Sequence, residues 1–345
     1  MSAAASPSAA DALIAAAVAH LRAGELVALP TETVYGLGAD AADPQAVGRI
    51  YAAKGRPANH PLIVHLAAAS HLDQWAASVP PAARALAEAF WPGPLTLILK
   101  KQPWVPEAVT GGQVTVGLRV PDHPLALRLL AAFAAAKAPA PAGIAAPSAN
   151  RFGRVSPTTA AHVREELGDK VALVLDGGPC AVGIESTIVD FSRAEPEILR
   201  PGAISAADIA RVAGVTPRQR GDGAGRNATP APRASGTLAA HYAPRTPLRL
   251  VDAAAFREEV ERLARAGKKI AVLARAAAPG DIPASCHWRV APGDAAGYAR
   301  ELYANLRALD ALGVELIAVE DVPTDAAWRA VADRLGRAAT GAGKK

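Results

Sequence analysis

Aromatic residues and cysteines are both scarce in this 345-residue chain. Aromatic residues make up 4% of it although 51% of its residues are hydrophobic, so its core must be built mostly from Ala, Val, Leu and Ile. Its two cysteines, Cys180 and Cys286, belong to no CxxC motif or Cys/His cluster. This spacing argues against a structural zinc site and favours the reducing cytoplasm.

Targeting and membrane-spanning segments are not evident either. The stretch MSAAASPSAADALIAAAVAH lacks a basic start and is interrupted by Asp11, so it does not resemble a secretory signal. No uncharged apolar run of about 18 residues occurs. We therefore expect a soluble, cytoplasmic protein without a membrane contact.

The common nucleotide-binding and hydrolase motifs are missing. GAGKK has neither the spacing nor the hydroxyl residue of a P-loop, and Ala41 stands where a dinucleotide-binding loop that begins at Gly36 would need its third glycine. There is no HExxH or GxSxG motif. If the chain binds phosphates, it must do so with side-chain cations and hydroxyl groups.

The net charge of +5 is unevenly placed. Residues 1–205 carry 16 Lys and Arg against 17 Asp and Glu, whereas residues 206–247 carry 6 against 2. The basic middle segment leaves nucleic-acid binding open, but the near-neutral first part argues against a broad basic groove there.

Short β-type runs and helical patterns interleave in the first part of the chain. Apolar spacing predicts helices near 8–23, 81–90, 124–136 and 157–168, and Asp43-Pro44 and Gly55 are typical of a helix start and stop. The predicted strands are LVALPTET, PLIVHL, PLTLILK, VTVGLRV, AGIAAP, VALVLD, STIVDF and EILR. This order predicts an α/β domain with a mixed sheet over residues 1–205.

The remaining chain is predicted to contain a linker and a second domain. Ser205 and Asp208 resemble a helix capping pair, and the following segment, rich in Gly, Pro and Arg, has no period. Residues 206–246 are therefore interpreted as a linker. From 247 to 345, PLRLV, KKIAVLA and ELIAVE alternate with helical patterns, which predicts a small parallel α/β domain.

Polar groups recur at the predicted strand ends. In KGRPANHPLIVH, Lys54 and Arg56 would project to the same side of an extended segment and could grip phosphate oxygens, although an isolated KxR by itself favours a solvated turn. Ser148 and Asn150 follow a strand, and Ser156-Pro157 is predicted to start a helix whose N–H groups could bind an anion. Arg119 and Arg200 end two other strands, each as an ion-pair member or a carboxylate ligand.

The ordered set of motifs resembles a known family. The motifs are PTETVYGLG (30–38), KGRP with PLIVH (54–65), WPGPLTLIL (91–99), VGLRVPDHP (117–124), APSAN (146–150), SPT (156–158), GIESTIVD (183–190) and LRPG (199–202). Together they closely resemble the threonylcarbamoyl-AMP synthases of the YrdC type. ASGTLAAHYAP (234–244) is similar to the linker of the long form, whose second domain is Rossmann-like.

The resemblance implies a nucleotidyltransferase. L-threonine, bicarbonate or CO2, and ATP would give L-threonylcarbamoyladenylate and pyrophosphate, with Mg²⁺ as the counterion of ATP. The product would supply the threonylcarbamoyl group of adenosine 37 in tRNAs that read codons beginning with A. Direct tRNA contact and transfer to a downstream threonylcarbamoyl transferase complex are further expectations.

The resemblance also implies roles for individual residues. Lys54 and Arg56 would be catalytic. Positions matching the nucleotide side are Lys54, Arg56, His60, Thr115, Ser148, Asn150, Ser156, Arg200 and Tyr242, the last from a linker expected to cover the active site. Positions matching the threonine side are Thr33, His65, Arg119, Ala146 and Ser186, and no residue is implied as a protein ligand of a metal.

Two alternatives have different signatures. An RNA- or tRNA-binding module without catalysis would show steep salt dependence and no need for threonine. A carbamoyl-transfer domain of hydrogenase maturation would call for acylphosphatase-like and zinc-finger modules, for which the chain has neither the length nor the cysteines.

Overall fold

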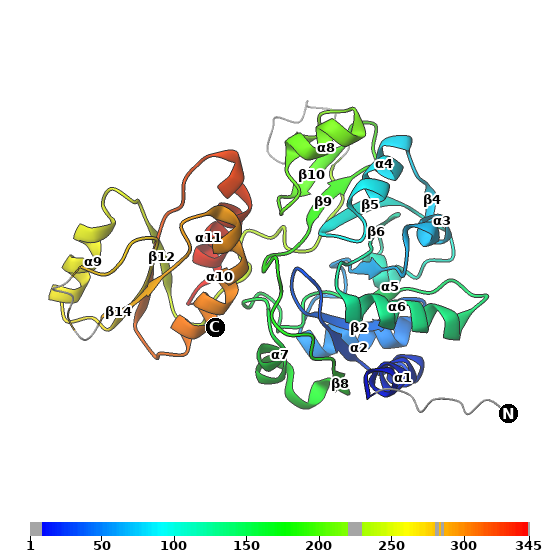
Figure 1. The fold of residues 1–345 in the computed structure, drawn as a ribbon, viewed down its shortest axis with the longest axis horizontal. Coiled ribbons are helices and arrows are strands. Elements are labelled where there is room, and N and C mark those ends of the chain that lie inside the picture. Colours follow the sequence, from blue (N-terminus) through cyan, green and yellow to red (C-terminus); the bar gives the residue numbers. More distant parts are fainter. Residues whose placement is uncertain (1–8, 220–229, 280–282, 284–285, 344–345) are drawn as a thin grey trace.

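The computed structural model describes residues 9–219, 230–279, 283 and 286–343. They form two lobes, each built on its own sheet (Figure 1). No helix among these residues is long and apolar enough to cross a membrane.

An 11-stranded mixed sheet organises the first lobe. Its order is β11-β10-β9-β5-β6-β3-β7-β2-β1-β8, and β4 pairs with β5. The strands are β1 (Val27–Leu29), β2 (Gly36–Asp40), β3 (Ile63–His65), β4 (Ala76–Ser78), β5 (Leu95–Lys101), β6 (Thr115–Arg119), β7 (Ile144–Ala145), β8 (Leu173–Val174), β9 (Thr187–Asp190), β10 (Glu197–Arg200) and β11 (Arg218–Gln219). The sheet contains both parallel pairs, such as β3–β6, and antiparallel pairs, such as β3–β7, so the predicted mixed sheet is confirmed.

Helices flank this sheet. They are α1 (Ala9–Arg22), α2 (Pro44–Lys54), α3 (Leu72–Trp75), α4 (Pro81–Phe90), α5 (Glu107–Thr110), α6 (Pro124–Lys137), α7 (Ala160–Leu167) and α8 (Ala206–Ala213), with 3-10 turns at Ala69–His71 and Gly168–Lys170. Two predicted caps are confirmed. Asp43 accepts from the backbone N–H groups of Gln45 and Ala46, and Ser205 and Asp208 form a capping box.

Two sequence predictions about this lobe are wrong. The helix predicted from Ser156-Pro157 begins only at Ala160, with Thr159 as its N-cap, because the Pro157 carbonyl accepts from the Tyr35 N–H instead of starting a helical ladder. The strand predicted over 26–33 ends at Leu29 because the Thr31 hydroxyl bonds to Val34 and closes a turn.

A four-stranded parallel sheet, β12-β15-β13-β14, forms the second lobe. Its strands are β12 (Leu248–Val251), β13 (Ile270–Ala274), β14 (Cys286–Val290) and β15 (Leu316–Glu320); its helices are α9 (Phe256–Arg265), α10 (Ala295–Asp310) and α11 (Arg329–Gly341), with a 3-10 turn at Ala326–Trp328. The parallel α/β prediction is confirmed, but β14 was not predicted. Its sequence, CHWRV, is too polar to stand out because several of its side chains are exposed.

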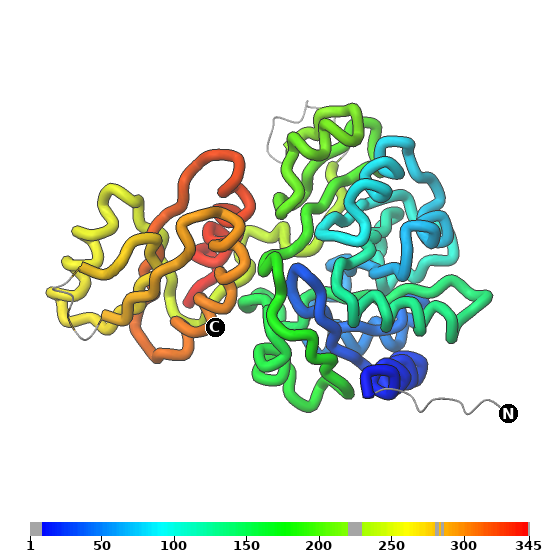
Figure 2. Tube along the Cα trace, in the orientation of Figure 1, coloured from blue at the N-terminus to red at the C-terminus, as the bar shows by residue number. Residues whose placement is uncertain are grey.

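Helices α10 and α11 lie on the side of the second lobe that faces the first, whereas α9 and β14 lie on the far side (Figure 1). The chain trace passes between the lobes in the segment that precedes β12 (Figure 2). A single apolar cluster contains residues of both lobes, among them Val155 and Ile184 from the first and Leu302 and Leu335 from the second. The lobes are therefore joined by a shared apolar core.

Candidate active site

One cavity collects residues from the strand ends of the first sheet and from the linker. Its walls come from the turn after β1, the end of α2, β3, β6 and β10, the loops around β7 and β9, and the segment 235–242. The lining residues are Thr31, Thr33, Val34, Gly36, Arg56, Ile63, His65, Arg119, Ala146, Pro147, Ser148, Glu185, Ser186, Arg200, Ser235, Gly236, His241 and Tyr242.

Nine of the fourteen residues singled out in the sequence line this cavity: Thr33, Arg56, His65, Arg119, Ala146, Ser148, Ser186, Arg200 and Tyr242. The other five, Lys54, His60, Thr115, Asn150 and Ser156, lie behind its walls or beside it. Segments up to 209 positions apart, from Thr33 to Tyr242, are thus brought together by the fold.

The sequence analysis placed Lys54 and Arg56 on one extended segment, and the structure shows that this is wrong. Lys54 is the last residue of α2, and Gly55 caps that helix in the left-handed conformation, with φ of 63°. The Lys54 ammonium donates to the carbonyls of Ser148 and Asn150, both at 2.5 Å. Burial, and then the nearby Arg56, lower the pKa of Lys54 well below its usual value.

Arg56 lies at the junction of the cavity wall and the linker. Its guanidinium donates to the Pro61 carbonyl at 2.9 Å and to the Ser235 hydroxyl at 3.1 Å. Burial lowers its pKa to about 10. The Phe152 ring lies 5.7 Å from the guanidinium carbon and 5.3 Å from the His60 ring, so His60 belongs to the same outer wall.

Arg119, which the sequence predicts to lie beside the threonine, already has an acidic partner. One of its terminal nitrogens pairs with the Glu32 carboxylate at 2.6 Å, and its Nε donates to the Gly93 carbonyl at 3.2 Å. His65 lies beside it, and burial, together with the charge of Arg119, lowers the pKa of His65 to about 3. His65 is therefore neutral at physiological pH and can accept as well as donate a hydrogen bond.

Arg200 and Ser186 form the opposite wall. Arg200 donates from Nε to the Ser186 carbonyl at 3.0 Å and from a terminal nitrogen to the Ser186 hydroxyl at 3.1 Å. The Ser186 hydroxyl is also 2.8 Å from that of Thr96. These contacts fix the Ser186 side chain, because its oxygen is bound from two directions.

Asn150 and Thr115 are placed more indirectly. The Asn150 amide donates to the carbonyls of Arg151 and Arg154, whereas its buried Oδ1 has no partner among the described residues. Thr115 lines a neighbouring cavity, which shares Ser235 and Ile63 with the main one. Thr115 therefore lies beside the main cavity, whereas Asn150 lines neither of these two cavities.

Ser156 acts as a buried hydrogen-bond donor and not as a helix cap. Its hydroxyl donates to Glu185 Oε1 at 2.7 Å. Glu185 lines the cavity, so Ser156 reaches the site through this carboxylate. Burial opposes the ionisation of Glu185, but Arg334 and further cations lower its pKa to about 2.

The linker closes one side of the cavity. Ser235 donates to the Pro61 carbonyl, and its own carbonyl accepts from Arg200. Tyr242 is buried in the left-handed conformation, with φ of 60°. A Cβ atom at Gly236 would lie only 2.0 Å from the Tyr242 hydroxyl oxygen, so this close approach requires glycine.

Several lining residues were not predicted from the sequence. Glu185 stands inside GIEST, and His241 directly precedes Tyr242, so their motifs were noticed while their roles were not. Ser235 and Gly236 lie within the linker motif ASGTLAAHYAP, but no role was assigned to them. Glu32 lies within PTET, and only its ion pair with Arg119, which the sequence does not reveal, connects it to the site.

Two family profiles match this chain over most of its length. The Sua5/YciO/YrdC profile, described as "Telomere recombination", matches residues 19–202, and a profile described as "Threonylcarbamoyl-AMP synthase, C-terminal domain" matches residues 204–340. The chain belongs to the threonylcarbamoyl-AMP synthase family. The prediction that the chain is a two-domain member of this family is thereby confirmed.

Individual members of the threonylcarbamoyl-AMP synthase family match over most of their length. The Pyrococcus abyssi enzyme is 39% identical, covering 93% of this chain and 92% of its own, and the Bacillus subtilis enzyme is 40% identical, covering 96% and 94%. The crystal structure of P. abyssi Sua5 complexed with L-threonine superposes with a TM-score of 0.84 at 37% identity, covering 95% of this chain and 94% of that one.

Proposed function

We propose that this chain synthesises L-threonylcarbamoyladenylate and pyrophosphate from L-threonine, bicarbonate or CO2, and ATP. The observation that carries the proposal is the cavity itself, which concentrates Arg56, Arg119 and Arg200 among hydroxyl groups. The reaction must hold a carboxylate, a carbamate and a triphosphate together against their mutual repulsion. Fixed cations in a desolvated cavity meet that requirement.

The bonds formed and broken define what the site must do. The threonine amine adds to CO2 and releases a proton, or condenses with bicarbonate and releases water, to give a carbamate. A carbamate oxygen then attacks the α-phosphorus of ATP. The bond from that phosphorus to the bridging oxygen breaks, and pyrophosphate leaves. No covalent nucleophile is required, so the contribution of the protein is charge stabilisation and positioning.

The threonine would be held by the side of the cavity that contains Thr33, His65, Arg119, Ala146 and Ser186. Arg119 is proposed to bind its carboxylate, with Glu32 orienting the guanidinium. The neutral His65 can hydrogen-bond to polar groups of the threonine without adding a second positive charge beside Arg119. Ala146 would contribute its backbone.

ATP would occupy the side bordered by Lys54, Arg56, His60, Thr115, Ser148, Asn150, Ser156, Arg200 and Tyr242. Lys54 and Arg56 are the proposed catalytic residues, because cations aimed at the transferring phosphorus stabilise its developing charge. The lowered pKa of Lys54 has a consequence for binding. A polyphosphate nearby would favour the protonated amine, so ATP binding should raise the pKa of Lys54 again.

Magnesium is proposed to enter as part of the MgATP substrate. Glu185 in the cavity wall and Glu32 beside it are each bound by an arginine. No group of three or more His, Cys, Asp or Glu side chains within the described residues could hold a metal. The ion would therefore be held by phosphate oxygens and water.

The wider setting is also proposed. We assign residues 1–205 to the catalytic domain, 206–246 to the linker and 247–345 to the second domain. The product would serve threonylcarbamoylation of adenosine 37 in tRNAs reading ANN codons, through the downstream transferase complex and tRNA. The two cysteines are free and buried, in keeping with the cytoplasmic location proposed.

Substitution of the two cations tests the proposal. Lys54→Ala and Arg56→Ala should each lower threonine-dependent pyrophosphate release by more than about tenfold, or more than about 1.4 kcal/mol of barrier. Arg49→Ala is the matched control, because Arg49 lies on the same helix but bonds to the Gly24 carbonyl. Normal rates in both test variants would contradict the assignment.

The RNA-binding alternative makes a separable prediction. A non-catalytic module would bind tRNA with an affinity that falls steeply with salt, and threonine would have no effect on it. Filter binding of tRNA at increasing salt, with and without threonine, distinguishes this alternative from catalysis.

A further inference from the structure

Glu185 is contacted by both lobes. It lies in the loop before β9, lines the cavity and is only 6% exposed. One oxygen, Oε1, accepts from Ser156 of the same lobe. The other, Oε2, accepts from the Tyr303 hydroxyl of α10 at 2.9 Å and from Arg334 Nε of α11 at 2.8 Å. The second lobe therefore supplies two of these three hydrogen bonds to a carboxylate in the cavity wall.

Arg334 binds more than the carboxylate. It is completely buried, and its terminal nitrogens donate to the Pro201 carbonyl at 2.9 Å and to the Glu185 carbonyl at 3.2 Å. The guanidinium carbon also lies 5.4 Å from the centroid of the Tyr242 ring. A buried arginine is tolerated only when its donors are matched in this way.

The position of these carbonyls in the chain matters. Glu185 directly precedes Ser186, and Pro201 directly follows Arg200. Ser186 and Arg200 are themselves hydrogen-bonded to each other in the cavity wall. Arg334 thus bridges the backbone on both sides of a cavity-lining pair, although its own side chain is not among the residues that line the cavity.

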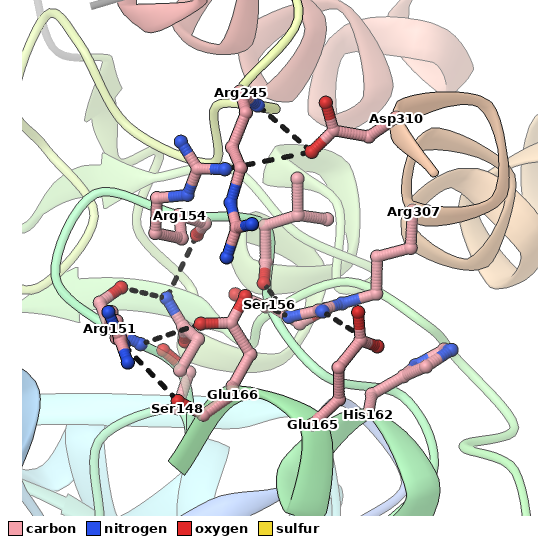
Figure 3. A network of polar contacts seen from close by, with 12 residues as sticks. Ser148, Arg151, Arg154, Ser156, His162, Glu165, Glu166, Arg245, Arg307 and Asp310 are labelled. Carbon is pink, nitrogen blue, oxygen red and sulfur yellow. Dashed lines mark hydrogen bonds and ion pairs between the residues drawn. The ribbon is translucent and has the colours of Figure 1, made fainter. Parts of the chain in front are cut away.

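A second arginine of the C-terminal lobe fixes the neighbouring loop (Figure 3). Arg307 of α10 donates to the Val155 carbonyl at 2.5 Å and pairs with Glu166 at 3.2 Å. Three residues further along α10, Asp310 accepts from the backbone N–H groups of Arg245 and Thr246 at the end of the linker. Ser156 is therefore held from two sides. Arg307 binds the carbonyl of the preceding residue, Val155, and Glu185 accepts from the Ser156 hydroxyl.

We propose that Tyr303 and Arg334 are positioning residues of the active site, acting through Glu185 and the Ser186–Arg200 pair. This rests on the proposed function, because it gives the C-terminal lobe a part in the same reaction. Loss of either contact lets the loop before β9 shift, which weakens the binding of threonine at Ser186 and of ATP at Arg200. Only an arginine fork can bridge Glu185 and Pro201, so Arg334→Lys does not restore the wild-type arrangement.

Tyr303→Phe is the mildest test, because it removes one hydroxyl group and keeps the ring. Tyr298→Phe is its matched control: Tyr298 is buried on the same helix, packs on Trp328 at 5.5 Å, and its hydroxyl has no hydrogen-bond partner among the described residues. In the full chain, Tyr303→Phe should lower kcat/KM for both threonine and ATP by about threefold to tenfold. Tyr298→Phe should stay within about twofold of the wild type.

A double-mutant cycle separates positioning from general stability. Because Tyr303 acts through Glu185, Tyr303→Phe should have less than about a twofold effect in a Glu185→Gln background. An equal effect in both backgrounds, or no difference between Tyr303→Phe and Tyr298→Phe, would overturn the proposal.

Hydrogen exchange supplies a readout that does not depend on catalysis. In the absence of substrates, backbone amides in residues 183–190 should exchange faster in Tyr303→Phe and Arg334→Lys than in the wild type, and Tyr298→Phe should match the wild type. Unchanged exchange would contradict the positioning role even if the wild type made no adenylate. Conversely, a wild type without threonine-dependent pyrophosphate release would contradict the proposed function alone.

Discussion

Two buried histidines face a cavity that is otherwise rich in arginine. Burial lowers the pKa of His65 and of His241 to about 3, and the charge of Arg119 reinforces the shift for His65. At neutral pH both rings are therefore uncharged. They provide hydrogen-bonding groups that add no further positive charge to a site already crowded with cations.

These histidines predict a loss of stability in mild acid. Their folded-state pKa lies below the ordinary value of 6.5, so the unfolded chain takes up protons first as the pH falls. Each should reduce the free energy of unfolding by roughly 1.4 kcal/mol between about pH 7.5 and pH 5.5. Urea denaturation of His65→Asn and His241→Asn should show a correspondingly weaker pH dependence than the wild type.

An exposed histidine provides the control for this measurement. His287 lies on β14, far from the cavity. His287→Asn should leave the pH dependence of the free energy of unfolding as it is in the wild type. If all three variants track the wild type, the two buried rings are not the source of the acid sensitivity.

Helix α2 links an N-terminal cap to Lys54, the proposed catalytic lysine. Asp43 holds the first turn, Gly55 ends the last, and Lys54 at the end of the helix reaches the carbonyls after β7. The helix thereby sets the position of Lys54, since its buried face packs in the main core of the first lobe.

Removal of the cap should weaken the whole helix. Asp43→Ala should reduce the free energy of unfolding by about 1 kcal/mol, because two backbone N–H groups lose their acceptor. Asp43→Asn keeps an acceptor oxygen and should remain near the wild type. Thermal or urea denaturation measures both, and equal stability of the Ala and Asn variants would argue against the cap.

For individual helices and strands, the sequence predicted the features that depend on a few neighbouring residues. The caps at Asp43 and Ser205 and the strand-end cations Arg119 and Arg200 follow from patterns of a few residues. Ser156 was misread because the bond from Tyr35 to Pro157 spans more than a hundred positions. The bond between Glu185 and Arg334 spans 149 positions, so neither residue could be paired from sequence spacing.

On the scale of the whole molecule, both lobes hold the walls of the cavity in place. The linker lines the cavity through Ser235, Gly236, His241 and Tyr242, and the second lobe binds the linker and the loop before β9. A linker that covers the bound nucleotide would keep water from the mixed anhydride, which hydrolyses readily.

Truncation after Gly214 should therefore reduce adenylate formation or shorten the lifetime of the intermediate. The shortened chain would lose every linker residue in the cavity wall while keeping Lys54 and Arg56. Circular dichroism should first establish that it is folded. Synthesis and an intermediate lifetime equal to those of the full chain would remove any catalytic part for the linker and the second lobe.

The most direct test of the account is substrate omission with the full-length chain. Purified protein is incubated with ATP, magnesium, bicarbonate and L-threonine, and pyrophosphate and the adenylate are both measured. The account predicts stoichiometric pyrophosphate and threonylcarbamoyladenylate only when all the substrates are present. Pyrophosphate release that is unchanged without threonine, or no adenylate in the complete mixture, would contradict it.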